Sequence, residues 1–190
     1  DSEAATVMTQ ALPLDGIRVV DYSHYLAGPH MSRCLAAMGA DVIKVERPGE
    51  GDATRGQLRD IPGVDGLYFT MLNHNKRSIT INTKTASGRA VLDRLIKTCD
   101  VMVENFKTGT MAKLGFDYAA LSKANPRLIY VSHKGFLPGP YQNRTALDEV
   151  VQMMGGLAYM TGPEGRPLRA GSSVNDIMGG MFGAIGALAA

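Results

Sequence analysis

The stretch from residue 17 to residue 46, IRVVDYSHYLAGPHMSRCLAAMGADVIKVE, decides the fold. It opens with the short apolar run 17–22, which predicts a buried strand. Pro29 then opens a helix over 30–38, because proline is favoured at the first helical position. Gly39 ends that helix, as glycine commonly does. Residues 41–46 form the next strand, so the stretch predicts a strand–helix–strand unit of a parallel sheet.

The rest of the chain continues this alternation. Its patterns predict strands at 78–82, 100–104 and 128–132, and helices at 67–72, 85–98, 110–114, 118–124, 147–154 and 177–190. Such an order predicts an α/β fold with a doubly wound, mostly parallel sheet. Ligands bind these sheets beyond the carboxyl ends of the strands. We therefore expect the functional residues in the segments 23–29, 46–51, 105–109 and 133–139.

The composition indicates a globular chain without a nucleic-acid surface. The 190 residues suit one domain, and 45% are hydrophobic against 20% charged. The net charge is only +2, and Lys and Arg form no dense block. Cys34 and Cys99 lie far apart, which favours a reducing compartment such as the cytoplasm.

The two ends of the chain give further expectations. Residues 1–11 lack a basic region followed by an apolar core, so we expect a flexible leader and not a secretory signal. The apolar segment 177–190 is shorter than the roughly 20 residues of a membrane span. We expect it to be a buried helix. Because this helix ends on Ala189-Ala190 without a polar cap, we expect the chain to be part of a longer protein.

The usual signatures of nucleotide, metal and serine-hydrolase sites are missing from the sequence. Neither GxGxxG nor GxxxxGK[ST] occurs, and no GxSxG marks a nucleophilic serine. The four histidines, His24, His30, His74 and His133, do not have the spacing of metal ligands, so we expect no metal. Each is more typical of a structural hydrogen-bonding group.

Cations occur near several predicted strand ends. They are Arg47, Lys76, Arg77, Lys84 and Lys113. Several cations along one edge would suit a polyphosphate ligand. A solvated basic edge explains the same pattern without any ligand.

Asp176 is the candidate catalytic residue, since it stands alone before a run of small apolar residues that lets other groups approach it. An ionised aspartate can attack an activated acyl group and form a covalent anhydride. Asp is also a favoured N-cap, so the residue equally suits the start of the helix 177–190.

Five motifs together resemble one family. They are LDGIRVVD at 14–21, GADVIKVERPG at 39–49, NHNKRSI at 73–79, DVMVENF at 100–106 and NPRLIY at 125–130, and they resemble the class III CoA-transferases. The resemblance extends from about residue 12 over almost the whole chain. TRGQLRDIP at 54–62 and LYFTMLN at 67–73 are especially similar to formyl-CoA transferases.

The resemblance implies a function and a set of site residues. Members have a large domain with a Rossmann-like fold and a smaller second domain. Two chains interlock into a homodimer. Residues 12–190 would be the N-terminal part of the large CoA-binding domain. CoA and acyl-CoA would be substrates, together with small carboxylic acids, and neither a membrane nor a nucleic acid would be a partner. Asp176 matches the catalytic aspartate. CoA would be held by or lie near Leu26, Ala27, Arg47, Ile81, Asn82, Thr83, Lys84, Asn105, Phe106, Lys107, Lys113, Thr145 and Asp148.

Some positions depart from the pattern of formyl-CoA transferases. Leu26 replaces a glutamine, and Lys113 replaces an arginine and so loses its two-pronged hydrogen bonding. The stretch 133–141 is more similar to members that act on C4 to C5 dicarboxylates, such as mesaconyl-CoA transferases. Related acyl-CoA racemases carry a histidine where Leu147 stands, and leucine cannot transfer a proton. A transferase is therefore favoured, with a racemase or a non-catalytic CoA-binding fragment as the alternatives.

Overall fold

The structure is a computed structural model that describes residues 11–190, so nearly all of the expected leader at 1–11 lies outside the described part. The strands are β1 (Arg18–Tyr22), β2 (Asp41–Glu46), β3 (Arg77–Thr80), β4 (Val101–Glu104) and β5 (Ile129–Ser132). The helices are α1 (Ala27–Ala37), η1 (Ala53–Gly56), α2 (Leu67–Asn73), α3 (Ala86–Ile96), α4 (Thr110–Leu114), α5 (Tyr118–Ala124), α6 (Asp148–Met154), α7 (Leu157–Thr161) and α8 (Val174–Ala189).

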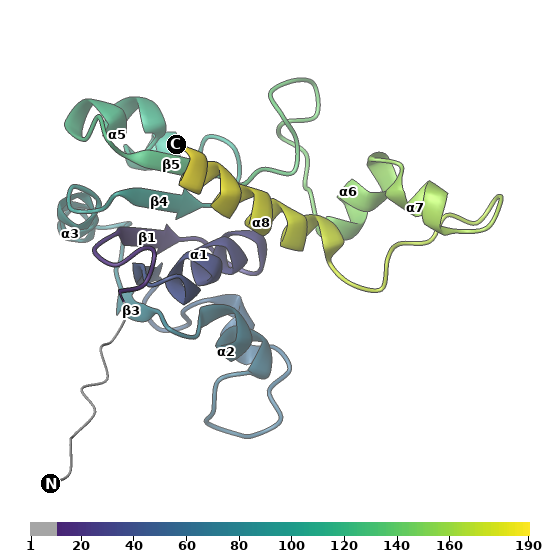
Figure 1. The fold of residues 1–190 in the computed structure, drawn as a ribbon, viewed down its shortest axis with the longest axis horizontal. Helices are drawn as coiled ribbons and strands as arrows, with labels where there is room; N and C mark the ends of the chain where they lie inside the picture. Colours follow the sequence, from purple (N-terminus) through teal and green to yellow (C-terminus); the bar gives the residue numbers. More distant parts are fainter. Residues whose placement is uncertain (1–10) are drawn as a thin grey trace, which may run out of the picture.

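All five strands are parallel and form one sheet in the order β3-β2-β1-β4-β5. Two helical layers enclose this sheet, with α1 and α8 on one face and α3, α4 and α5 on the other (Figure 1). The predicted doubly wound α/β fold is therefore confirmed. The strand order reverses between β1 and β4, and ligands of such sheets bind at this reversal.

Alternate residues of the central strands supply the two hydrophobic cores. Val20 and Met102 face the core under α3, α4 and α5, whereas Val19, Val101 and Val103 face the core under α1 and α8. This is the two-residue period of a strand. A strand buried on both faces has to be apolar almost throughout, which explains why the short apolar runs predicted strands correctly.

Small residues let α8 pack directly on α1. A Cβ atom at Gly180 would lie 2.8 Å from the Ala27 carbonyl oxygen, and one at Gly183 would lie 2.9 Å from the sulfur of Met31. Ala184 and Ala187 continue the same buried stripe. The glycines in this apolar run therefore allow a close approach of two helices, and that approach places the start of α8 beside the start of α1.

Most predicted elements agree with the structure to within one or two residues at each end, and the larger differences concern the helices. Helix α1 begins at Ala27, two residues before Pro29, and the proline is still tolerated because the first-turn N–H groups need no helical partner. Helix α8 begins at Val174 and not at residue 177. The sequence patterns missed α7, a helix of only five residues.

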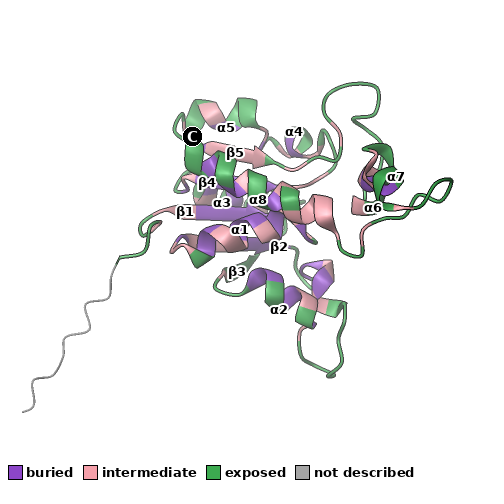
Figure 2. Ribbon diagram, turned by 45° about the vertical axis from the view of Figure 1, so that its right-hand side comes forward, coloured by how far each residue is buried: buried purple, intermediate pink, exposed green. Residues whose placement is uncertain are grey.

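Large apolar side chains remain exposed on the outer face of α8 and on α6 and α7, which project from the body of the molecule (Figures 1 and 2). On α8 they are Met178, Met181, Phe182, Ile185 and Leu188. Their spacing of three or four residues makes one continuous stripe. An exposed apolar stripe of this size is typical of a surface that another segment or subunit covers.

Candidate active site

The loops after β1 and β4 meet at the reversal of strand order and are joined by hydrogen bonds. The His24 backbone N–H donates to Asn105 Oδ1 at 2.8 Å, and Asn105 Nδ2 donates to the His24 carbonyl at 2.6 Å. The Phe106 ring contacts the rings of Tyr22 and His24, with centroid distances of 4.7 and 5.2 Å. The segments 23–29 and 105–109, which the sequence predicted to be functional, thus lie side by side and form one surface. Burial is the main reason that the pKa of His24 lies below its usual value, with Asp52 opposing the shift.

A buried network of charges supports this surface from below. Asp21 accepts hydrogen bonds from Lys76 Nζ at 2.9 Å and Ser32 Oγ at 2.7 Å, and Lys44 Nζ lies 2.9 Å from Asp52 Oδ2. Burial alone would raise the pKa of Asp21, but Lys44, Lys76 and the hydrogen bonds outweigh it and hold the pKa well below its usual range. Because a buried charge without partners is very costly, the network fixes these groups in one arrangement.

The same network positions the loop that contains Leu26 and Ala27. Lys44 Nζ donates to the carbonyl of Ser23 at 3.0 Å, and the backbone N–H of Tyr25 points to Asp52 Oδ1 at 3.4 Å. Tyr25 has a φ of 63°, an unusual value for a residue other than glycine. Leu26 follows as a buried residue, and its carbonyl accepts the first hydrogen bond of α1 from His30 at 2.7 Å. The turn is therefore held from beneath by side chains of β2 and of the loop after it.

The loop 47–66 is anchored to the end of β2. Arg55 donates to both carboxylate oxygens of Glu46, at 2.8 and 2.6 Å, and its guanidinium lies 3.8 Å from the centroid of the Phe69 ring. This anchor orients α2 and brings Tyr68 within electrostatic reach of Asp176. Burial first, and then the charges of Asp176 and Asp52, raise the pKa of Tyr68 to about 12.

Asp176 is the third residue of α8, and the interpretation of it as an N-cap is wrong. Ser173 occupies the cap position and makes no side-chain cap hydrogen bond. One turn after Asp176, Gly180 abuts the Ala27 carbonyl, so the carboxylate lies at the end of α8 that meets the start of α1. Burial, and secondarily the charge of Asp148, raises the pKa of Asp176 to about 6. It is thus a half-buried carboxylate that is more basic than an ordinary aspartate and is still ionised at pH 7.

The other predicted CoA-binding residues lie mostly along the carboxyl edge of the sheet. Thr83 Oγ1 is 2.9 Å from Tyr22 Oη, which ties the segment after β3 to β1. Ile81 is buried, and the side chains of Arg47, Lys84, Lys107 and Lys113 are exposed. Arg47 also pairs with Glu50 and donates to the Gly51 carbonyl at 3.2 Å. Thr145 is exposed just before α6, whereas Asp148, the first residue of α6, is half-buried.

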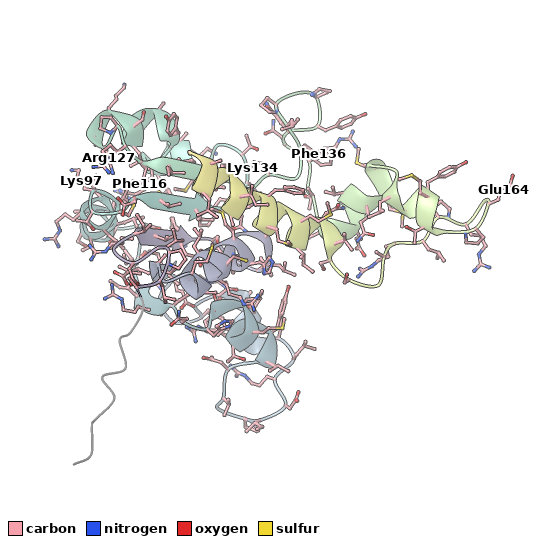
Figure 3. All side chains as sticks on the ribbon, viewed as in Figure 1. Lys97, Phe116, Arg127, Lys134, Phe136 and Glu164 are labelled. Atoms are coloured by element: carbon pink, nitrogen blue, oxygen red, sulfur yellow. The ribbon has the colours of Figure 1, made fainter. Side chains whose placement is uncertain are left out.

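A hollow of about 420 Å³ opens beside this edge, between β4, β5, α4 and α5. Its lining includes Lys107, Lys134 and Tyr130, but neither Lys113 nor Asp176. Lys134 lies where the chain leaves β5, and Lys97, Phe116 and Arg127 gather at the opposite end of the sheet (Figure 3). The hollow has the size of a small-molecule site and adjoins the predicted CoA segment without containing the candidate nucleophile.

Two of the five cations noted in the sequence are not available to a ligand on this edge. Lys76 Nζ is buried against Asp21 and the carbonyl of Pro29. Arg77 pairs with Asp41, the first residue of β2, and so lies towards the amino ends of the strands. The position of Lys76 in the sequence did not predict the location of its charge, because a lysine side chain is long enough to reach a partner in another strand.

Sequence reasoning also missed functional candidates. No feature of the sequence marked Tyr68, because a tyrosine in a short apolar helix is usually a core residue. Gln152 was unmarked, although it is completely buried. Asp21 and Lys44 did carry a signal, since each is a charged residue inside an apolar strand, and such residues are rarely buried unless they are paired.

In residues 11–190 the side chains of His, Cys, Asp and Glu form no group suited to a metal ion. Both cysteines are unpaired thiols. Among the helices of the same described part, none has the length and hydropathy needed to cross a bilayer.

Comparison with known proteins identifies relatives over nearly the whole chain. The family model for CoA-transferase family III matches residues 14–190. A formyl-CoA:oxalate CoA-transferase of Rhodopseudomonas palustris is 53% identical over 184 residues, which are 96% of this chain and 43% of that protein. The enzyme of the same name from Bradyrhizobium diazoefficiens is 51% identical over 184 residues, again 96% of this chain and 43% of that protein. The chain therefore spans less than half the length of these curated relatives.

Solved structures agree with the fold. A CaiB/BaiF family protein from Brucella suis is 42% identical with a TM-score of 0.89, over 95% of this chain and 49% of that one. A hypothetical protein from Mycobacterium tuberculosis is 38% identical with a TM-score of 0.83, over 95% and 50% of the two chains.

Proposed function

Because the chain belongs to CoA-transferase family III, we propose that the protein is an acyl-CoA:carboxylate CoA-transferase and that Asp176 is its nucleophile. The observation that carries this proposal is the setting of one carboxylate. Asp176 is half-buried at the carboxyl edge of a doubly wound sheet, next to the turn at the reversal of strand order, with a pKa of about 6. Such a carboxylate is ionised at neutral pH and is a stronger nucleophile than an exposed aspartate.

An aspartate suits CoA transfer because its acyl derivatives stay activated. A carboxylate oxygen of Asp176 attacks the acyl carbonyl carbon, the carbon–sulfur bond breaks, and CoA leaves as thiolate. The thiolate attacks the aspartyl carbonyl of the resulting anhydride, releasing the first acid and leaving an aspartyl-CoA thioester. The acceptor carboxylate then attacks the aspartyl carbonyl of this thioester, which forms a second anhydride and releases the thiolate. Attack of the thiolate on the acyl carbon of the second anhydride gives the new acyl-CoA and regenerates Asp176.

CoA binding along the carboxyl edge follows from its charge and its accessible turns. In this proposal the exposed Arg47, Lys84, Lys107 and Lys113 attract the phosphates, since cations on one rim favour a polyphosphate. The pantetheine arm runs past the Leu26–Ala27 turn, the segment 81–83 and the Asn105–Phe106 turn towards Asp176. Thr145 and Asp148 also border the bound CoA, Asp148 at its reacting end, because the Asp148 carboxylate accepts the Asp176 backbone N–H. Binding energy from these remote contacts helps to stabilise the reacting centre.

The proposed substrates are small mono- and dicarboxylic acids and their CoA thioesters. The relatives are named as formyl-CoA:oxalate CoA-transferases. Leu26, an apolar residue at the turn beside the nucleophile, would favour an acid with an apolar portion over oxalate, so C4 to C5 dicarboxylates are included.

The described residues would be the N-terminal part of the large CoA-binding domain, and the protein would act as an interlocked homodimer. The exposed apolar stripe of α8 supports this proposal, because a second domain or subunit would cover it. A racemase is disfavoured because Leu147, at the position of the racemase base, cannot exchange a proton.

The test is a transfer assay on the full-length protein. Formyl-, succinyl- and mesaconyl-CoA are offered with oxalate, succinate and related acids, and the new CoA ester is detected by mass spectrometry. Transfer between at least one pair supports the proposal. Deuterium uptake at the α-carbon of a chiral acyl-CoA without transfer would favour a racemase. The same assay on residues 1–190 alone tests the third alternative, because CoA binding without either reaction would make this part a non-catalytic CoA-binding fragment.

The ionisation of Asp176 gives a pH prediction. The nucleophile must be deprotonated, and its pKa is raised to about 6, first by burial and then by Asp148. We therefore expect kcat/KM to be constant above about pH 7 and to fall about tenfold per pH unit once the pH is well below this pKa. Initial rates between pH 4.5 and 8 measure this fall, the acid limb of the pH profile. A limb near pH 4, the range of an ordinary aspartate, would contradict the assigned environment.

A further inference from the structure

Gln152 is a buried polar side chain on α6 whose bonding groups are all used. Its Oε1 accepts the backbone N–H of Ala170 at 2.7 Å, and its Nε2 donates to the carbonyl of Ser172 at 3.2 Å and to Asp148 Oδ1. The side chain is completely buried. Because the Ala170 group that faces the amide is its N–H, a donor, Oε1 must face it, and Nε2 must face Asp148. The orientation of the amide is therefore fixed by the backbone.

Asp148 carries this arrangement to the candidate nucleophile. One of its carboxylate oxygens is held by Gln152, and the other accepts the backbone N–H of Asp176 at 3.0 Å. The first N–H groups of a helix have no partner within it. Ser173 supplies no side-chain cap to α8. A carboxylate from another helix therefore satisfies the N–H of the residue that we propose as the nucleophile.

The location of these bonds gives them a mechanical consequence. Helices α6 and α7 project away from the sheet, and α6 contacts the body of the molecule at α8 (Figure 1). Gln152 ties α6 to the loop that leads into α8, and Asp148 ties α6 to the first turn of α8. If these hydrogen bonds between α6 and the start of α8 were lost, Asp176 would shift. A shift of about 1 Å at a reacting group can cost about a hundredfold in rate.

We propose that Gln152 is a positioning residue for CoA transfer: it holds the Asp148 carboxylate against the Asp176 backbone and so fixes the nucleophile. This inference rests on the proposed function. It adds a residue that does not touch CoA and acts through Asp148 and through the loop 170–172 that leads into α8.

A swapped pair separates this role from simple packing. Gln152→Glu places two carboxylates in contact, and Asp148→Asn places two amide nitrogens in contact. The double variant restores an amide-to-carboxylate bond with its polarity reversed, but it replaces the 3.2 Å bond to Ser172 with a contact between two acceptor oxygens, so only part of the rate is expected to return. In the double variant the negative charge also moves to the side of residue 148 away from Asp176. The titratable groups around Asp176 are then Tyr68 of α2 and the displaced charge of residue 152, with His30 of α1 and His133 after β5 packed against α8 further along at Gly180 and Gly183.

The experiment uses the full-length protein with its best acyl-CoA and acceptor acid. For Gln152→Glu and for Gln152→Met we expect kcat to fall by about tenfold to a hundredfold, with KM for acyl-CoA within about twofold, because the chemistry and not CoA binding is disturbed. The double variant should recover about tenfold over Gln152→Glu. Its acid limb should lie at lower pH than that of the unaltered protein. Gln142→Met, at an exposed glutamine outside the site, is the matched control and should not change kcat.

Unchanged kcat in both Gln152 variants would overturn the inference, as would a double variant no faster than Gln152→Glu. If Gln152→Met does not fold, the swapped pair decides, with circular dichroism and the melting temperature as its folding check. If the unaltered protein catalyses no transfer, the proposed function fails first. If the unaltered protein catalyses transfer and the Gln152 variants have the same kcat, only the positioning role of Gln152 is refuted.

Discussion

Asp176→Ala lowers the rate of CoA transfer by about 10³-fold or more while acyl-CoA still binds, because removing a covalent nucleophile removes the reaction path and not the CoA contacts. Asp176→Glu keeps a carboxylate but moves it by about one methylene group, so a loss of about a hundredfold is expected. Steady-state transfer rates and a fluorescence or calorimetric titration with acyl-CoA measure the two properties separately.

Asp93→Asn is the matched control for removing a carboxylate. Asp93 pairs with Lys97 on the surface of α3, away from the site. Its replacement should leave transfer unchanged. Retained turnover in Asp176→Ala would exclude the proposed anhydride.

The second large effect concerns stability. Asp21→Ala removes the carboxylate that Lys76 and Ser32 share and leaves two buried lysines with Asp52 as their remaining acidic partner. Breaking a buried pair from one side typically costs about 3–5 kcal/mol, since the remaining charge stays buried. We expect a loss of this size in the free energy of unfolding, measured by urea denaturation at pH 7.

Asp41→Asn provides the comparison for this variant. Asp41 is a partly exposed carboxylate paired with Arg18 and Arg77, and such a surface group contributes only about 0–1 kcal/mol. The pKa of Asp21 is held below its usual value, so its contribution is present above about pH 4 and is lost as the pH falls towards the folded-state pKa. Equal losses for the two variants at pH 7 would contradict the account of the buried network.

The fold was predictable because its signals are local. Short apolar runs flanked by glycine or proline mark parallel strands, and the strand 41–46 and the helices 110–114 and 118–124 have the predicted bounds. Helix ends were less predictable, because α8 begins three residues earlier than its apolar run and takes no cap from its own chain segment. A first-turn N–H of this helix, that of Asp176, is instead satisfied by Asp148, which lies 28 residues away and contacts Asp176 only in the folded protein.

The site was predictable only in part. The family resemblance assigned Asp176, and the strand-end rule indicated the turns of β1 and β4 that the His24–Asn105 hydrogen bonds join. Neither could reveal that Lys76 lies inside the protein or that Gln152 holds Asp148, since both depend on which side chains meet in space. Burial and hydrogen bonding turn an ordinary glutamine into a structural link.

One measurement tests the central claim most directly. The full-length protein is incubated with acyl-CoA and hydroxylamine, digested and analysed by mass spectrometry. A trapped acyl-enzyme at the proposed nucleophile leaves a hydroxamate on the peptide that contains Asp176, and we expect it at that aspartate alone and only when acyl-CoA is present. Active protein with an unmodified Asp176, or with the hydroxamate on another residue, would contradict the account.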